Sequence, residues 1–269
     1  MNADIATGYL REVSGNPSFS RADLLEAMQA HGMHVNIAGF KAILQRLLDT
    51  GRIARAGRNA YFVLPDGLSD YVYEYAEGTE SIAESIEQGF PEMEFSIFEL
   101  RQLNEFVNHQ IAHNTVFVHV PAEAMDFVFD AMREEYPGKV LLNPSIGDYH
   151  QYWCPDMIVM KRLISESPLG RRTRWHSRIE KVLVDLMADH VLQGIVSPAE
   201  LPGIYEDAFH KYVIDESCLF RYAKRRNAAQ KIRRFIQDET DIVLRLEKND
   251  SQIQFCRRAY PCLATEEPP

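Results

Sequence analysis

The sequence predicts a mixed α/β protein of two domains, from its length, its charge distribution and a change in the spacing of apolar residues. Its 269 residues exceed the length of one small domain. The expected order is a winged helix-turn-helix at residues 1–64, an acidic linker at 65–92, an α/β domain with a helical C-terminal layer at 93–238, and a tail at 239–269.

The charge distribution supports the first boundary. Residues 1–63 carry seven Lys/Arg against five Asp/Glu, whereas residues 64–136 carry two against sixteen. Residues 137–269 are nearly balanced, with 20 against 18, so the formal net charge of −10 originates in the middle segment. Pro65 and Gly67 mark a turn at the boundary. The negative total therefore does not exclude nucleic-acid binding by the mildly basic first segment.

Composition excludes several other classes of protein. With 46% hydrophobic and 25% charged residues, the chain is typical of a globular protein. Its longest apolar runs, such as 116–120, fall far short of the roughly 20 residues that cross a bilayer. No secretory signal begins the sequence, so the expected location is the cytoplasm, without a membrane. The four cysteines have no zinc-type spacing, and we expect reduced thiols and no metal: Cys154, Cys218, Cys256 and Cys262.

Capping residues and apolar spacing predict three N-terminal helices. The first contains Leu10 and Val13. Ser20 and Asp23 are spaced as a variant capping box for the second. Asn36 caps the third, whose expected buried face consists of Ile37, Phe40, Ile43, Leu44, Leu47 and Leu48.

Two short apolar strands follow, separated by a turn that contains Gly57. Three helices and such a hairpin are typical of a winged helix-turn-helix, which places its third helix in the major groove and its hairpin along the phosphates. Asn36 and Gln45 could pair with adenine, and Lys41 and Arg46 with guanine or phosphate. The predicted DNA-binding residues are Asn36, Lys41, Gln45, Arg46, Arg52, Arg55 and Arg58.

The alternative use of the same domain is protein contact, with these charges simply solvated. Three arginines within seven residues, with no acid among them, favour DNA: Arg52, Arg55 and Arg58. A single domain of this size makes few phosphate contacts, so we expect either a homodimer on DNA or a second basic surface.

From Met93 onward, strands and helices alternate before the chain becomes helical. Strands are predicted at 94–98, 115–120, 139–142 and 157–160, with helices at 100–109 and 122–135 between them. Further helices are predicted from Ser177 onward, at 198–212, 216–223 and 226–237.

Six motifs in this region resemble one known family. They are LNEFVNHQ at 103–110, NTVFVHV at 114–120, LLNP at 141–144, LISESP at 163–168, IEKVLVDL at 179–186 and RYAKRR at 221–226. In this order, and behind a winged helix, they resemble the bacterial AbiEi-like antitoxins of type IV toxin–antitoxin systems. The resemblance runs from about Leu10 to about Ile236.

The resemblance implies a repressor of its own operon that binds double-stranded promoter DNA. It also implies that the C-terminal domain counters a nucleotidyltransferase toxin, an action thought in this family not to depend on tight toxin binding. It implies no cofactor.

Basic residues of the C-terminal part either form a second nucleic-acid surface or neutralise the acidic segment. One set, which also includes Lys161 and Lys181, lies around a loop with Pro168 and Gly170; the other follows Arg221. The residues expected on the surface are Arg171, Arg172, Arg174, Arg178, Lys224, Arg225 and Arg226.

A nuclease-like enzyme is the rival hypothesis. Asp156 with Glu180 and Lys181 faintly resembles a metal-dependent nuclease core, but that core needs its acid and lysine two residues apart. No GxSxG, Walker, GxGxxG or HExxH motif occurs. We therefore expect no catalytic residues, and a winged-helix interaction scaffold remains the third hypothesis.

Overall fold

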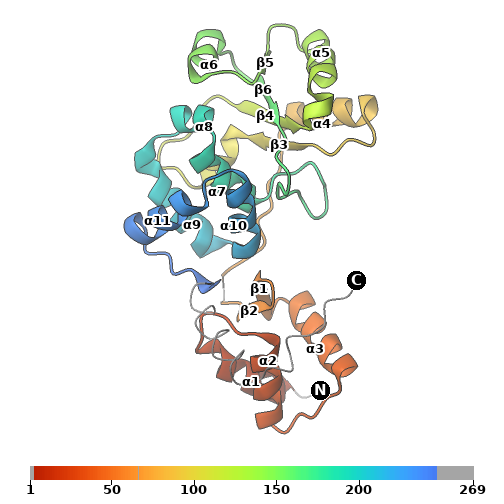
Figure 1. The fold of residues 1–269 in the computed structure, drawn as a ribbon, viewed down its shortest axis with the longest axis vertical. Helices are drawn as coiled ribbons and strands as arrows, with labels where there is room; N and C mark the ends of the chain where they lie inside the picture. The colour runs from red at the N-terminus through yellow and green to blue at the C-terminus, as the bar shows by residue number, and fades with distance from the viewer. Residues whose placement is uncertain (1–2, 66, 247–269) are drawn as a thin grey trace. The chain divides into compact units, whose positions relative to one another are not determined.

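The computed structural model describes residues 3–65 and 67–246, which form a mixed α/β protein (Figure 1). The chain folds into two compact units. The first contains residues 1–69 and 215–217 and, near the C-terminus, the described residues 243–246; the second contains 70–214 and 218–242.

Three helices and a hairpin make up most of the first unit: α1 (Ala3–Ser14), α2 (Arg21–Ala30), α3 (Ile37–Asp49), β1 (Ile53–Gly57) and β2 (Ala60–Val63). The two strands are antiparallel. Phe19, which lies between α1 and α2, pairs with Tyr61 of β2 through two backbone hydrogen bonds of 2.7 and 2.8 Å. The predicted succession of three helices and two strands is confirmed.

Local hydrogen bonds explain where these helices begin. The Ser20 hydroxyl accepts a bond from the Asp23 amide, and the Asp23 carboxylate accepts one from the Ser20 amide, so the predicted capping box is confirmed. The Asn36 side chain caps α3. Apolar side chains from the helices and the hairpin then close one core, which includes Leu10, Val13, Leu24, Met28, Phe40, Leu44, Leu47, Ile53 and Tyr61.

Distant parts of the chain complete the first unit beside the hairpin. The buried Glu216 carboxylate accepts backbone hydrogen bonds of 2.9 Å from both Arg245 and Leu246. The Arg245 guanidinium lies 4.1 Å from the centroid of the Phe62 ring. The predicted tail at 239–269 therefore includes a segment that packs in this unit, whereas residues 247–269 lie outside the described part of the chain.

A four-stranded sheet organises the second unit in the order β3–β4–β6–β5. Its strands are β3 (Ser96–Glu99), β4 (Thr115–Val120), β5 (Val140–Leu142) and β6 (Met157–Arg162). β3 is antiparallel to β4, while β4, β6 and β5 are mutually parallel. The apolar runs in β4 and β6 suit strands that are covered on both sides.

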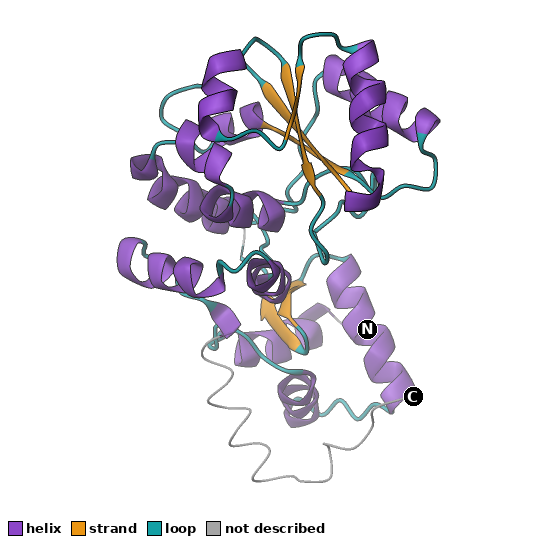
Figure 2. Ribbon diagram, turned by 45° about the horizontal axis from the view of Figure 1, so that its top comes forward, coloured by secondary structure: helices purple, strands orange, loops and turns teal. Residues whose placement is uncertain are grey.

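Helices cover both faces of this sheet (Figure 2). One face packs against α4 (Glu77–Gly89) and α5 (Met125–Glu135) through an apolar core that includes Val118, Met160 and Ile86. The other face carries His119 and Lys161, which reach toward α7 (Ile179–Ala188) and the residue that follows it. The remaining helices are α6 (Ile146–Tyr152), α8 (His190–Ile195), α9 (Leu201–Lys211), α10 (Glu216–Arg225) and α11 (Ala229–Glu239), with short 3-10 turns at Leu100–Glu105, Ala122–Ala124 and Pro198–Glu200.

The segment predicted as a linker at 65–92 contains structure instead. Its helix α4 buries Ile82, Ala83 and Ile86 in the core of the second unit. Tyr75, just before α4, is also buried, and its ring packs edge-on against Trp175 at 4.8 Å. Acidic composition suggested a solvated connection, but the apolar residues at helical spacing determine that this segment packs.

None of the helices in the described ranges is both long enough and apolar enough to cross a membrane.

Candidate nucleic-acid interface and buried charge network

Helix α3 presents the side chains predicted to read bases. Its buried residues lie on one side, so Lys41, Gln45 and Arg46 are exposed on the remainder of the helix. Asn36 is also exposed, but its Oδ1 accepts a 2.8 Å bond from the Gly39 amide as the helix cap. While that cap persists, Asn36 has only its Nδ2 donor to offer a ligand.

Gln45 also has a partner within the helix. Its Nε2 donates a 2.7 Å hydrogen bond to Oδ1 of Asp49, one turn further along. An exposed bond of this spacing stabilises a helix by only a few tenths of a kcal/mol, about 0.2–0.5. Gln45 can therefore exchange Asp49 for a base edge at little cost.

Ile37 corrects the sequence analysis. It was expected on the buried face, but its side chain is 77% exposed. The buried residues of α3 begin almost one turn later, at Phe40, because the first turn of the helix extends beyond the core of this unit. Periodicity assigns a face to a residue, but it does not show whether another element covers that end of the helix.

The hairpin presents the predicted phosphate-binding arginines. Arg55 is the exposed residue of β1 between buried neighbours, and its guanidinium lies 6.0 Å from the centroid of the Tyr61 ring. Arg58 and Asn59 form the turn, with Asn59 in the left-handed region at φ 54°. Arg52, before β1, is also exposed. All seven predicted DNA-binding side chains thus reach solvent.

The hairpin turn is held in place by side chains from two other segments. The Arg21 amide donates to Oδ1 of Asn59 at 3.2 Å, and the Arg58 amide donates to the Ser217 hydroxyl, also at 3.2 Å. Both bonds use the Arg58–Asn59 turn through its backbone or through Asn59. The charged end of Arg58 therefore remains available for an anion.

The second basic surface predicted in the C-terminal part is not continuous. Arg178 is largely buried and bonds Glu180 at 2.7 Å, while Arg226 is 15% exposed and turns toward two buried aspartates. Arg174 and Arg225 are exposed but pair with Glu94 and Glu166. The exposed remainder is Arg171, Arg172 and Lys224. Sequence composition could not anticipate these acidic partners, which come from distant elements.

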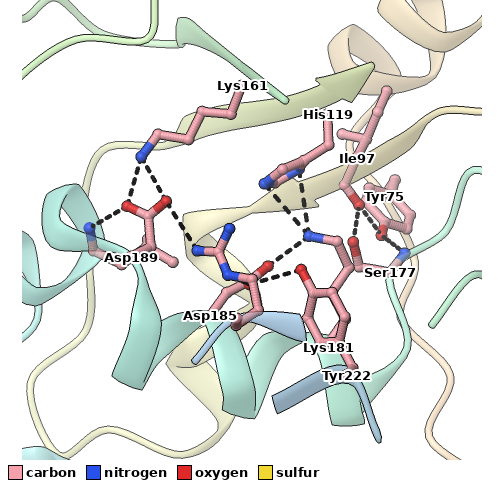
Figure 3. A network of polar contacts seen from close by, with 11 residues as sticks. Tyr75, Ile97, His119, Lys161, Ser177, Lys181, Asp185, Asp189 and Tyr222 are labelled. Carbon is pink, nitrogen blue, oxygen red and sulfur yellow. Dashed lines mark hydrogen bonds and ion pairs between the residues drawn. The ribbon is translucent and has the colours of Figure 1, made fainter. Parts of the chain in front are cut away.

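A network of buried charges occupies the second unit between the sheet and α7 (Figure 3). Lys181 Nζ donates a 2.6 Å bond to Oδ2 of Asp185, one turn further along α7, and lies 3.4 Å from both ring nitrogens of His119. The Tyr222 hydroxyl donates to Oδ1 of the same aspartate at 2.9 Å. Lys181, Asp185 and His119 are each at least nine-tenths buried.

A second carboxylate extends the network. Asp189 accepts bonds of 2.6 and 2.5 Å from Lys161 Nζ on β6, and it also caps α8 by accepting the amides of Val191 and Leu192. Arg226 lies 3.3 Å from Asp185 and 3.7 Å from Asp189. The network therefore joins β4, β6, α7 and the end of α10 by ion pairs.

The network also sets protonation states. Burial, reinforced by the neighbouring Lys181, holds the pKa of His119 well below its usual value, so the imidazole is neutral. Burial alone would raise the pKa of Asp189, but Lys161 outweighs it and lowers that pKa. Three cations and two carboxylates consequently face one neutral histidine in the interior.

The signal for this network was present in the sequence. Lys181 and Asp185 are four residues apart in an otherwise apolar helix, and Lys161 ends an apolar strand. Charged residues are rarely buried unless paired, so polar positions within apolar runs indicate ion pairs. Grouping Lys161, Lys181 and Arg226 with the surface cations missed that indication.

The residues of the rival nuclease hypothesis have other surroundings. Asp156 is exposed before β6. Glu180 pairs with Arg178, and Lys181 pairs with Asp185. Within residues 3–65 and 67–246, no group of three or more His, Cys, Asp or Glu side chains is arranged to hold a metal ion.

A smaller hydrogen-bond cluster supports the start of α7. The Tyr75 hydroxyl donates to the Ile97 carbonyl at 2.8 Å and accepts the Ser177 amide at 3.1 Å, while the Ser177 hydroxyl donates to the same carbonyl (Figure 3). Tyr73 and Tyr71 also pack within the second unit, against Tyr75 and Phe106 respectively. These tyrosines, expected to pack between domains, are structural residues of one unit.

The fold and the exposed cations define a mixed α/β protein with a solvent-facing basic helix and hairpin. Residues 39–242 match DUF6577, a family of unknown function, and the chain belongs to that family. The matched range begins in α3 and ends with the second unit.

Other comparisons add little. The crystal structure of the RV2827C protein from Mycobacterium tuberculosis is similar to this chain at 11% identity and a TM-score of 0.24, over 90% of this chain and 84% of that chain. A likeness at this level carries no argument. No curated protein matches the sequence.

Proposed function

We propose that the first unit is a winged helix-turn-helix that binds double-stranded DNA, and that the chain represses its own promoter as the antitoxin of a type IV toxin–antitoxin system. The toxin would be a nucleotidyltransferase. The mechanism is binding and requires neither catalysis nor a cofactor. The antitoxin part of the proposal rests on the six motifs that resemble AbiEi-like antitoxins.

The order of elements in the first unit supports the DNA-binding part. A helix, a strand-like bridge at Phe19, two more helices and a hairpin follow one another as in winged helices that place their third helix in the major groove. By this analogy α3 would face base edges and the β1–β2 turn would lie along the phosphates. The proposed site is therefore the exposed side of α3 together with the hairpin.

The observation that carries the proposal is the exposure of all seven candidate residues. Lys41 and Gln45, near the middle of α3, would contact base edges, with Asn36 adding a donor through Nδ2. Arg55 and Arg58 would hold phosphate oxygens, which gives affinity and register without sequence preference. Five of the seven are cations, as binding to a polyanion requires.

The test is a salt-series titration of the full chain against its own promoter duplex and a scrambled duplex of equal length. The double variant Arg55→Ala/Arg58→Ala should weaken binding to both duplexes and reduce the salt slope by roughly 2, because each lost phosphate contact removes about 0.9 from that slope. Gln45→Ala should instead change the preference between duplexes.

A charge-matched control is Arg11→Ala/Arg133→Ala, which removes two exposed arginines from α1 and α5. It should leave the slope close to that of the wild type. An unchanged slope in the hairpin variant would remove the hairpin from the proposed interface. Absence of any duplex preference by the wild type would leave the first unit as a protein-contact module.

Growth rescue tests the antitoxin part separately. The chain, co-expressed with a nucleotidyltransferase encoded beside it, should restore growth that the toxin arrests. The Arg55→Ala/Arg58→Ala variant should retain this rescue while losing repression of a promoter reporter, because the resemblance assigns the antidote action to the C-terminal domain. Failure of the wild type to restore growth would leave a DNA-binding protein without an antitoxin role.

A further inference from the structure

Ile37 is an apolar side chain that the protein leaves uncovered. At 77% exposure it is the most exposed large hydrophobic residue in the described part of the chain. It occupies the first position of α3 and contributes nothing to the core that Phe40, Leu44 and Leu47 form. A β-branched residue also has no helix-forming advantage there, so neither packing nor helix propensity accounts for an isoleucine.

Its neighbours on the helix are the proposed base-reading residues. Ile37, Lys41 and Gln45 follow one another at intervals of four residues, and all three are exposed, so they form one row along α3. Ala38 and Ala42 are exposed beside this row. Because alanine side chains are short, they allow another molecule to approach the row closely.

The surrounding charge selects the kind of molecule. Lys41 and Arg46 on α3, with the three hairpin arginines, favour a polyanion over an apolar protein surface. In the DNA major groove the exposed apolar group is the C5-methyl of thymine, which lies beside the donors and acceptors of the base edges. A row of one apolar and two polar side chains complements such an edge.

We propose that Ile37 contacts a thymine methyl group in the major groove and is a specificity-determining residue of this protein. The inference rests on the proposed DNA binding and adds a base preference that the polar residues alone do not provide. Lys41 and Gln45 recognise hydrogen-bonding groups, whereas Ile37 distinguishes thymine from a base without that methyl.

Deoxyuridine provides the direct test, because it differs from thymine only by the missing methyl. Within the promoter site that the wild type protects in footprinting, thymines are replaced one at a time by deoxyuridine, and each duplex is titrated with the full chain. At one position the wild type should lose affinity by about fourfold, the factor that corresponds to about 0.8 kcal/mol for one buried methylene-sized group.

Ile37→Ala should abolish that thymine preference, binding the two duplexes equally, while its preference at the other thymines stays unchanged. Val72→Ala is the matched control, since Val72 is 72% exposed and belongs to the second unit. This control should keep the fourfold ratio. A general weakening through misfolding would not remove the ratio at one position alone.

The outcomes separate the inference from the function beneath it. If the wild type binds its promoter but shows no thymine preference, or if Ile37→Ala retains that preference, the inference is overturned and DNA binding stands. If the wild type binds no duplex at any salt concentration, both are overturned.

Discussion

Lysine and arginine are used in opposite ways in the two units. In the first unit, Lys41, Arg55 and Arg58 are exposed on a helix and a hairpin. In the second, Lys161 and Lys181 are buried and bonded to carboxylates. The first arrangement leaves cations for an external anion, whereas the second satisfies them internally.

The difference teaches how the two kinds of cation respond to substitution. A solvated charge contributes little to folding, so its removal should affect binding and spare stability. A buried charge is desolvated, so removing its partner leaves an uncompensated ion inside the protein. Four variants or conditions would sharpen or break this contrast.

The largest effect is expected from Asp185→Ala, because Lys181, Tyr222 and Arg226 all lose their partner. We expect the free energy of unfolding of the second unit to fall by about 3–5 kcal/mol. Urea unfolding followed by tryptophan fluorescence measures it, since both tryptophans, Trp153 and Trp175, lie in that unit.

Two comparisons make this measurement specific. Asp130→Ala, at an exposed position of α5, should change stability by no more than about 0.5 kcal/mol. The double variant Lys181→Met/Asp185→Leu should recover part of the loss, because it buries no unpaired lysine. If Asp185→Ala proved as mild as Asp130→Ala, the network would not be a stabilising element.

A smaller effect is expected from pH. Because the pKa of His119 is held well below its usual value, the unfolded chain binds a proton below about pH 6.5 and the folded chain does not. Stability present above that pH is therefore lost as the pH falls, by up to about 1.4 kcal/mol per pH unit. His176, whose burial also lowers its pKa, adds to the loss with the same sign.

Tryptophan-monitored unfolding at pH 8, 6 and 5 would measure this slope. His119→Gln should reduce it, leaving the contribution of His176. His150→Gln, which changes an exposed histidine of α6, is the control for loss of a histidine as such. Equal slopes in the wild type and His119→Gln would show that His119 is not the responsible group.

The smallest stability effect should come from the hairpin. Arg55→Ala/Arg58→Ala should shift the thermal midpoint by an amount equivalent to about 0.5 kcal/mol or less, since both side chains are exposed. Circular dichroism would follow the melt. A large loss of stability would mean that these arginines support the fold, and their effect on DNA binding would then need a second, better-tolerated variant such as Arg55→Lys.

Much of the first unit was predictable because its signals are local. Ser20 with Asp23, and Asn36, cap their helices through residues at most three positions away. The hairpin follows from two short strands around a tight turn, and β4 and β6 from continuous apolar runs. Of the candidate site, the residue types and their exposure were anticipated, but the exposed Ile37 and the Gln45–Asp49 bond were not.

The sequence by itself determined where elements begin and which side chains carry charge, because caps, turns and periodicity act within a few residues. Only the tertiary structure decided which charges and apolar groups are covered. Arg226 turns inward because α7 brings Asp185 to it, the 65–92 segment packs because a sheet receives it, and Ile37 stays exposed because no element reaches it. Burial depends on segments distant in the chain, which local patterns do not encode.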